Sequence, residues 1–143
     1  GGKLIEGIFR GETINTPAML CVADYLDALD WVGSIGGLDA AIAKSEANLE
    51  VIKSFVAQRS WIHFLAQKTD QISNTSVCLT LDLEAEQVKK IVKLLDSAAV
   101  AFDIGAYRDA PAGLRIWCGA TVEESDLDAL MPWIDWAYGQ VSE

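Results

Sequence analysis

Apolar residues recur at steps of three and four near the start of the chain, which predicts two amphipathic helices. The first is expected to begin at Thr16-Pro17, because threonine caps helices well and proline is tolerated in the first turn. Gly36-Gly37 should end this helix, and the second should then extend over about Leu38–Gln58.

Two stretches with the same spacing lie in the C-terminal half of the chain. The first predicts a helix over about Leu83–Ser97. The second follows Thr121, which together with Glu124 resembles a capping box. Pro132 lies inside this last pattern and should kink the helix or split it in two.

Four shorter segments have the pattern of β-strands. Apolar and polar residues alternate over Thr75–Leu81, Val100–Ile104 and Leu114–Cys118, and Trp61–Leu65 is a short apolar run. Half-buried strands between helices predict an α+β fold, with a small antiparallel or mixed sheet of about four strands and helices packed on one face.

The N-terminal residues 1–14 are expected to form a connector that arrives from a large domain outside this chain. They are rich in glycine and hold only short apolar islands, and the lack of an initiator methionine fits a fragment. Residues 15–143 have the size of one ordinary domain and contain no repeat or low-complexity tract, so we expect a single small domain there.

The composition is apolar for a chain with 22% charged residues: hydrophobic residues make up 51%, and the mean hydropathy is +0.21. Charged residues nevertheless interrupt every stretch long enough to cross a membrane. The apolar excess and the five tryptophans therefore predict a face that is buried against another surface. The pair Trp133 and Trp136 fits packing or such an interface better than a cofactor site.

The net charge of −10 argues against binding to nucleic acid, which requires a basic face. The three cysteines are widely spaced and odd in number, which favours reduced thiols over a disulfide framework or a zinc site. No secretion signal is visible, so the composition fits a cytoplasmic protein. His63 is the single histidine, and we assign it no function; no metal site is expected.

Two arginines are the best candidates for binding chemistry. Arg115 lies between Leu114 and Ile116 in a predicted strand, where it could grip a carboxylate through two hydrogen bonds or form an ion pair with an acidic residue. Arg108 lies beside Tyr107 and could help to bind a dianion such as a phosphate, although an exposed pair with the next residue in the chain is the commoner use.

The segment Asn15-Thr16-Pro17 allows two interpretations. It could simply cap the helix that follows, or it could offer donors to a phosphate at the positive end of the helix dipole. The glycines of residues 33–37 follow a helix and lack a phosphate-loop ending, so they are interpreted as a helix stop. No pair of nucleophile and base is evident, and the residues therefore predict an anion-binding domain without a catalytic set.

Several motifs together resemble the phosphoserine aminotransferases, pyridoxal-phosphate enzymes of fold type I, class V. They are found at residues 11–17 (GETINTP), 25–29 (YLDAL), 36–38 (GGL) and 73–77 (SNTSV), and above all at residues 102–119 (FDIGAYRDAPAGLRIWCG). The resemblance extends over essentially the whole chain, and it identifies the chain as the C-terminal small domain of such an enzyme.

The resemblance implies a cytoplasmic homodimer of serine biosynthesis, which exchanges an amino group between phosphoserine/3-phosphohydroxypyruvate and glutamate/2-oxoglutarate. It implies that Arg115 grips the substrate α-carboxylate and that Asn15 and Thr16 reach the cofactor phosphate across the dimer. Arg108 matches an arginine of the substrate phosphate site. Tyr107 stands where better-known members have histidine, so its role at that site is in doubt.

The family's cofactor-binding lysine matches none of the lysines of this chain and belongs to the missing large domain. The chain alone is therefore expected neither to bind pyridoxal 5′-phosphate covalently nor to transaminate, and no catalytic residue is assigned within it. Two alternatives stay open: the small domain of a class V aminotransferase of the serine/alanine-glyoxylate type, and a stand-alone α+β module that binds an acidic metabolite.

Overall fold

The computed structural model describes residue 2, residues 4–13 and residues 15–142. The chain divides into two compact units, Gly1–Leu38 and Asp39–Glu143, and each is described by itself. Ile14, the last residue of the expected connector, lies outside the described residues, as do Gly1 and Glu143 at the two ends of the expected domains.

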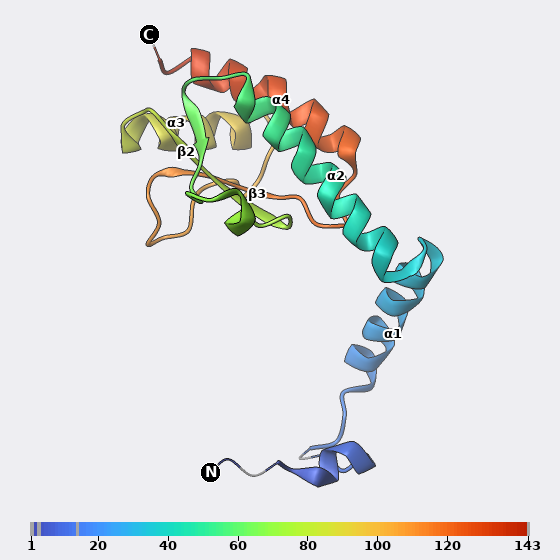
Figure 1. Cartoon of the computed structure of the whole chain (residues 1–143). Helices are drawn as coiled ribbons and strands as arrows, with labels where there is room; N and C mark the ends of the chain where they lie inside the picture. Colours follow the sequence, from blue (N-terminus) through green and yellow to red (C-terminus); the bar gives the residue numbers. More distant parts are fainter. Residues whose placement is uncertain (1, 3, 14, 143) are drawn as a thin grey trace. The chain divides into compact units, whose positions relative to one another are not determined.

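The first unit contains a short 3₁₀-helix, η1 (Glu6–Arg10), and a long helix, α1 (Met19–Ser34) (Figure 1). The expected cap at Thr16 is wrong. The N-cap is Ala18, in extended conformation and without a side-chain cap. Ala18 has φ −74° and ψ 107°, so the chain is still extended after Pro17 and the helix begins two residues after it.

The end of α1 agrees with the sequence. Gly36 and Gly37 have φ values of 111° and 78°, a left-handed conformation that glycine adopts at little cost. Most apolar side chains of α1 are exposed, and none of its residues is buried. The large exposed ones are Met19, Leu20, Val22, Tyr25, Leu26, Leu29 and Trp31.

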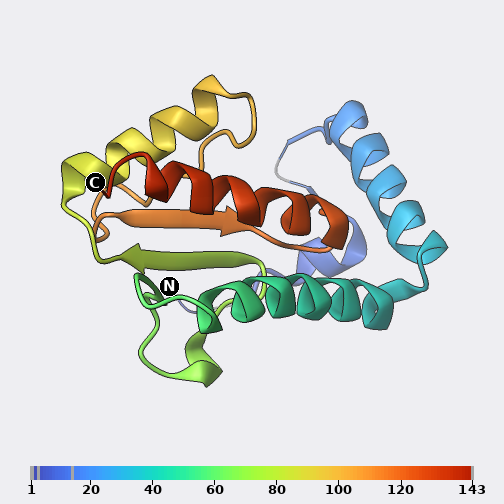
Figure 2. The same ribbon diagram turned by 90° about the horizontal axis from the view of Figure 1, so that it is seen from above.

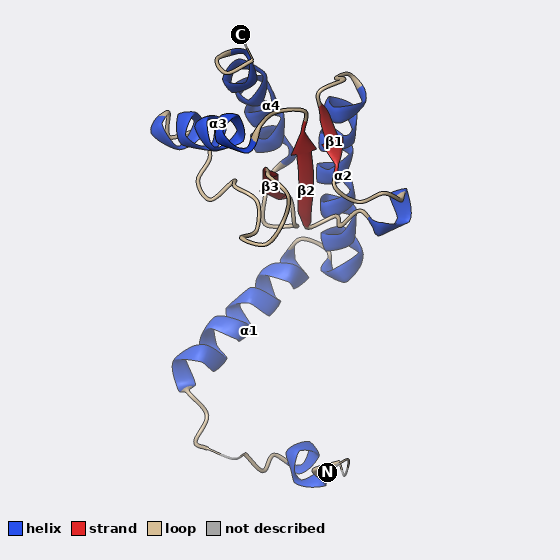
Figure 3. Cartoon of the chain, turned by 90° about the vertical axis from the view of Figure 1, so that its left-hand side faces the viewer, coloured by secondary structure: helices blue, strands red, loops and turns tan. Residues whose placement is uncertain are grey.

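The second unit is built on an antiparallel sheet with the order β1-β2-β3 (Figure 3). Its strands are β1 (Ile62–Phe64), β2 (Ser76–Leu81) and β3 (Gly113–Trp117), and a one-turn 3₁₀-helix, η2 (Thr69–Gln71), lies between the first two. Figure 2 shows β2 and β3 side by side and pointing in opposite directions.

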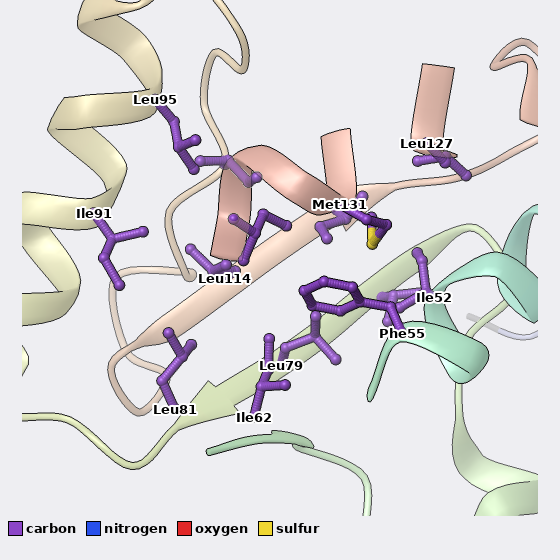
Figure 4. Close-up of a cluster of buried hydrophobic side chains, with 14 of the residues drawn as sticks. Ile52, Phe55, Ile62, Leu79, Leu81, Ile91, Leu95, Leu114, Leu127 and Met131 are labelled. Carbon is purple, nitrogen blue, oxygen red and sulfur yellow. The ribbon is translucent and has the colours of Figure 1, made fainter. Parts of the chain in front are cut away.

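Three helices supply the rest of this unit: α2 (Gly37–Ala57), α3 (Ala85–Ser97) and α4 (Glu124–Gly139). Their buried residues and one face of the sheet form a single apolar core. Figure 4 shows Ile52 of α2, Ile91 of α3 and Met131 of α4 lying around Leu79 and Leu114 of the sheet. The expected α+β architecture, with helices on one face, is confirmed.

The fourth expected strand, Val100–Ile104, is replaced by an irregular segment. Ala99 and Asp103 adopt left-handed φ values of 56° and 53°, which interrupt an extended chain. What remains of the pairing is one bridge between Gly105 and Leu114. The sheet of the described residues therefore has three strands, and it is antiparallel rather than mixed.

The starts of the last two helices also differ from the expectation. Helix α3 begins two residues later than predicted, with a capping box formed by Glu84 and Gln87. The capping box expected at Thr121 is absent, since α4 begins after Glu123 and the Thr121 hydroxyl accepts a hydrogen bond from Trp117 Nε1 at 3.3 Å. Pro132 lies inside α4, which continues through it as one helix.

One buried amide ties the start of α4 to α2. Asn48 is 1% exposed, and its Nδ2 donates to the carbonyl oxygens of Cys118 at 3.1 Å, Gly119 at 3.2 Å and Val122 at 2.9 Å. These carbonyls belong to the turn that follows β3. The side chain therefore fixes the direction in which the chain leaves the sheet.

Replacing this amide is expected to destabilise the second unit. An Asn48→Leu variant keeps a similar volume but removes the Asn48 donor from the Cys118 and Val122 carbonyls, while the Gly119 carbonyl keeps the Val122 N–H at 3.0 Å. We expect a loss of about 2–3 kcal/mol in the free energy of unfolding. Chemical denaturation of both proteins measures the difference. A Glu46→Leu variant on the exposed side of α2 is the control and should change stability by less than about 0.5 kcal/mol. An equally small loss for Asn48→Leu would contradict this role.

Candidate anion-binding site

The sheet face opposite the core carries the polar side chains of β2 and β3. Leu114 and Ile116 are buried on the helix side, so Arg115 and Trp117 point the other way, as the alternation predicts. Arg115 pairs in register with Cys78 of β2, and Trp117 pairs with Ser76.

Glycine is required at position 113, the first residue of β3, for a steric reason. A Cβ atom at Gly113 would collide with the backbone carbonyl of Leu79 on β2. Because Gly113 permits this close approach, the first residues of β3 can pair with β2 and Arg115 reaches its place in the sheet.

Arg115 is held by Asp103, from the irregular segment before β3. Its Nη2 atom donates to Asp103 Oδ2 at 2.6 Å and to the Asp103 carbonyl oxygen at 3.2 Å. The Arg115 side chain is 24% exposed, whereas that of Asp103 is 89% exposed. The ion pair that the sequence offered as the alternative to carboxylate binding is therefore present in the structure.

Tyr107 lies against the same arginine. The Arg115 guanidinium carbon is 4.6 Å from the centre of the Tyr107 ring, and the Tyr107 hydroxyl is 3.4 Å from Ser76 Oγ. The hydrogen bond with Ser76 and the nearby Arg115 lower the pKa of Tyr107. Tyr107 and Asp103 in turn raise the pKa of Arg115 against the opposing effect of burial, so the guanidinium stays charged.

Arg108 has a different environment. Its side chain is 93% exposed, and its Nε lies 3.5 Å from Oδ1 of Asp109. Arg108 and Tyr107 both line a hollow of about 430 Å³ beside α3, together with Lys89. Of the two residues expected at a phosphate site, the structure thus brings Tyr107 to Arg115 and leaves Arg108 extended into solvent.

Asn15 and Thr16 belong to the first unit and lie immediately before α1. Both are exposed. The first turn of α1 has no side-chain cap and no acidic residue, so its backbone N–H groups are available to an anion. A helix start of this kind can accept an anion.

A cavity of about 390 Å³ opens beside Arg115. Its wall includes Asp103, Ser76 and Trp117, and the first half of α4 contributes Asp126. The sequence singled out none of these four residues as a partner of Arg115. An aspartate in an apparently alternating strand gave no sign of the left-handed conformation that turns it toward the arginine.

Other chemistry is sparse in the part of the chain that the structure describes. No group of three or more His, Cys, Asp or Glu residues there is arranged to hold a metal ion. No helix among the described residues is both long and apolar enough to cross a membrane. Burial raises the pKa of the Cys118 thiol to about 11. His63 is exposed and lies 3.0 Å from Asp82.

Comparison with known sequences identifies close relatives. The phosphoserine aminotransferase of Methanosarcina mazei is 53% identical over 141 residues, which is 99% of this chain and 38% of that protein. The phosphoserine aminotransferase of Methanosarcina barkeri is 54% identical over the same share of each chain. This chain therefore spans about 38% of the length of the curated relatives that it matches. No family model matches it.

Solved structures with the same fold agree with this comparison. The phosphoserine aminotransferase of Bacillus circulans subsp. alkalophilus superposes with a TM-score of 0.83 over 93% of this chain and 36% of its own, at 18% identity. The 4-hydroxyphenylacetaldehyde synthase of Rhodiola rosea gives a TM-score of 0.60 over 73% of this chain and 23% of its own, at 14% identity. At these identities the superpositions speak for the fold alone.

Proposed function

We propose that this chain, which belongs to the phosphoserine aminotransferase family, is the C-terminal small domain of a phosphoserine:2-oxoglutarate aminotransferase of serine biosynthesis. In this proposal the missing large domain carries the lysine that binds pyridoxal phosphate. Residues 1–14 are the connector from that domain, and the enzyme is a cytoplasmic homodimer. The contribution of this chain is to bind the anionic groups of the substrate and the cofactor.

The environment of Arg115 is the observation that supports the proposal most strongly. This residue is an arginine on the open face of the sheet, 24% exposed, charged, and already bound to a carboxylate in the structure. A guanidinium in this setting binds a substrate carboxylate with good geometry, because its planar donors match two carboxylate oxygens. Binding there orients the Cα atom of an amino acid or an oxo acid relative to the rest of the site.

The phosphate of the substrate is assigned to Arg108, with Tyr107 nearby. Arg108 extends into solvent beside an exposed acidic neighbour, and such an ion pair has a low cost of exchange. The Arg115 guanidinium lies over the Tyr107 ring, and Tyr107 directly precedes Arg108 in the chain, so Tyr107 is next to both proposed anion sites. In this placement, the residues that donate to the substrate carboxylate and to its phosphate lie on one short stretch of chain, residues 107–115.

Asn15, Thr16 and the uncapped start of α1 are proposed to hold the cofactor phosphate of the neighbouring subunit. When bound, pyridoxal phosphate supplies the electron sink that amino transfer requires. The residues of this chain contribute hydrogen-bond donors and the positive end of a helix dipole, which fix an anion in place.

The reaction itself is tested on the full-length protein that carries this chain. We expect amino transfer from L-phosphoserine to 2-oxoglutarate, with far lower activity for L-serine or L-alanine as the donor and glyoxylate as the acceptor. A preference for the unphosphorylated pair would favour the serine/alanine-glyoxylate type instead. Binding of acidic metabolites without any amino transfer would favour a non-enzymatic module.

Arg108 should decide whether the phosphate is recognised here. An Arg108→Ala variant of the full-length protein is expected to lose about tenfold or more in kcat/KM for L-phosphoserine, because a charge-assisted contact to the phosphate is removed. The loss for L-serine should be much smaller. Lys89→Ala is the control, since Lys89 lines the same hollow but is paired with Glu86 at 2.7 Å. Equal losses for both donors would argue against a phosphate role.

A further inference from the structure

The contact between Arg115 and Asp103 has the chemistry of the ligand that the site is proposed to bind. The Asp103 carboxylate presents Oδ2 to the arginine Nη2 at 2.6 Å, as an α-carboxylate would. The Asp103 carbonyl oxygen accepts from the same nitrogen at 3.2 Å. Asp103 thus binds the Nη2 atom of Arg115 with both its side chain and its backbone.

The backbone of Asp103 is shaped for this contact. Its φ of 53° lies in the left-handed region, which residues other than glycine rarely adopt. Among those residues, aspartate and asparagine tolerate this conformation best. The left-handed turn interrupts the extended run before Ile104. Because an extended residue 103 would continue the alternating pattern of a strand, the turn is what allows one residue to offer both acceptors.

The two partners differ sharply in their exposure to solvent. The arginine side chain is 24% exposed and is packed against the Tyr107 ring, whereas the aspartate side chain is 89% exposed. An ion pair whose acidic member is almost fully solvated holds weakly and can open at little cost. The exposed Asp103 carboxylate can therefore move away at a lower cost than the Arg115 side chain.

A ligand can reach the same guanidinium. Asp103 and Arg115 both line the cavity of about 390 Å³, which also includes Ser76 and Trp117. A carboxylate that enters this cavity meets an arginine whose charge is already balanced by Asp103, and it also meets the further negative charge of Asp126. Binding at Arg115 is therefore an exchange of one carboxylate for another.

We propose that Asp103 is an internal carboxylate that occupies Arg115 until a substrate carboxylate displaces it, and that it thereby lowers the affinity of the site for carboxylates. This inference rests on the proposed function, in which Arg115 binds the substrate carboxylate. Asp103 is a specificity-determining residue in this scheme and not a catalytic one, because it leaves the guanidinium when the substrate arrives.

The test measures affinity with a matched pair of unreactive ligands on the full-length protein. D-3-Phosphoglycerate carries a carboxylate and a phosphate, and sn-glycerol 3-phosphate has a hydroxymethyl group in place of the carboxylate. In an Asp103→Asn variant the left-handed backbone and its carbonyl oxygen are kept while the charge is removed. Titration calorimetry should show phosphoglycerate binding about two- to fivefold more tightly than to the unaltered protein, with glycerol phosphate nearly unchanged.

Two further variants make the result decisive. Asp103→Gly also keeps the left-handed backbone and should tighten phosphoglycerate in the same way. Asp128→Asn removes the same charge from the groove between α2 and α4, and it should leave both ligands unaffected. Weaker or unchanged phosphoglycerate binding in both Asp103 variants would overturn the proposal, and weaker binding would instead make Asp103 a positioning residue for Arg115.

The proposed function is checked separately in the same titrations. If Arg115→Gln leaves the affinity for phosphoglycerate unaltered, the assignment of the carboxylate to Arg115 fails, whatever the Asp103 variants do. If Arg115→Gln weakens phosphoglycerate while neither Asp103 variant tightens it, the proposed function stands and the exchange with Asp103 is wrong.

Discussion

The Arg115→Gln variant of the full-length protein is expected to raise the KM values for L-phosphoserine and for 2-oxoglutarate by roughly a hundredfold. Both substrates carry the carboxylate that this guanidinium is proposed to bind. Glutamine keeps an uncharged amide donor on a side chain two bonds shorter, and it loses the charge and the paired donors. It also leaves Asp103 with a weaker partner than the charged Nη2 that the carboxylate contacts at 2.6 Å.

Steady-state kinetics with each substrate varied in turn measures this effect. An Arg115→Lys variant should recover part of the affinity, because an ammonium keeps the charge without the planar pair of donors. Arg10→Gln is the matched control: Arg10 is an exposed arginine of η1, paired with Glu6 at 3.5 Å, and its loss should leave both KM values unchanged. An Arg115→Gln enzyme with KM values close to those of the unaltered protein would contradict the carboxylate assignment.

The isolated 143-residue chain is expected to show no transaminase activity above that of the free cofactor. The resemblance places the cofactor-binding lysine in the large domain, and none of the seven lysines here matches the motif around it. Lys44, Lys53 and Lys89 each lie in an ion pair with a glutamate instead. In the proposed function the lysine of the large domain moves the proton at the Cα atom, and we expect no residue of this chain to replace it.

The measurement supplies pyridoxal phosphate, L-phosphoserine and 2-oxoglutarate to the purified chain and follows the formation of glutamate. The rate should equal that of the free cofactor in buffer, and the full-length protein assayed in parallel should exceed it by many orders of magnitude. A rate above the cofactor control that disappears when one particular lysine of this chain is replaced would refute the claim that the catalytic lysine lies in the large domain.

Much of the fold could be predicted from periodicity, because the buried positions follow simple rules. The alternation of Leu114, Arg115 and Ile116 placed the arginine on the open face of the sheet, and the structure agrees. The sequence predicts the glycine pair after α1 as a helix stop, and the left-handed φ values of both glycines agree with this. Helix α2 was predicted to within one residue at each end.

Local exceptions to periodicity could not be predicted in the same way. Val100, Phe102 and Ile104 alternate like a strand, yet Ala99 and Asp103 turn the chain into the left-handed region, which composition does not reveal. The cap expected at Thr121 fails because its hydroxyl is used by Trp117, a contact set by the path of the chain in space. Such contacts depend on tertiary packing rather than on neighbouring residues.

The candidate site also combines a feature that the sequence pattern predicts with contacts that it does not. Arg115 was visible as a charged residue in an apolar strand, but its partners were not. Asp103 lies twelve residues away along the chain, and Tyr107 was expected beside a phosphate rather than against the guanidinium. Sequence spacing alone cannot give such a contact, because it arises where an irregular segment folds back onto the sheet.

The central claim is that this domain recognises its substrate because Arg115 binds the substrate carboxylate. The most direct test is a calorimetric comparison of D-3-phosphoglycerate and sn-glycerol 3-phosphate binding to the full-length protein, unaltered and as Arg115→Gln. The account predicts that the substitution weakens phosphoglycerate strongly and leaves glycerol phosphate almost unchanged, so that the two ligands bind the variant with similar affinity. Equal weakening of both ligands, or of neither, would contradict it.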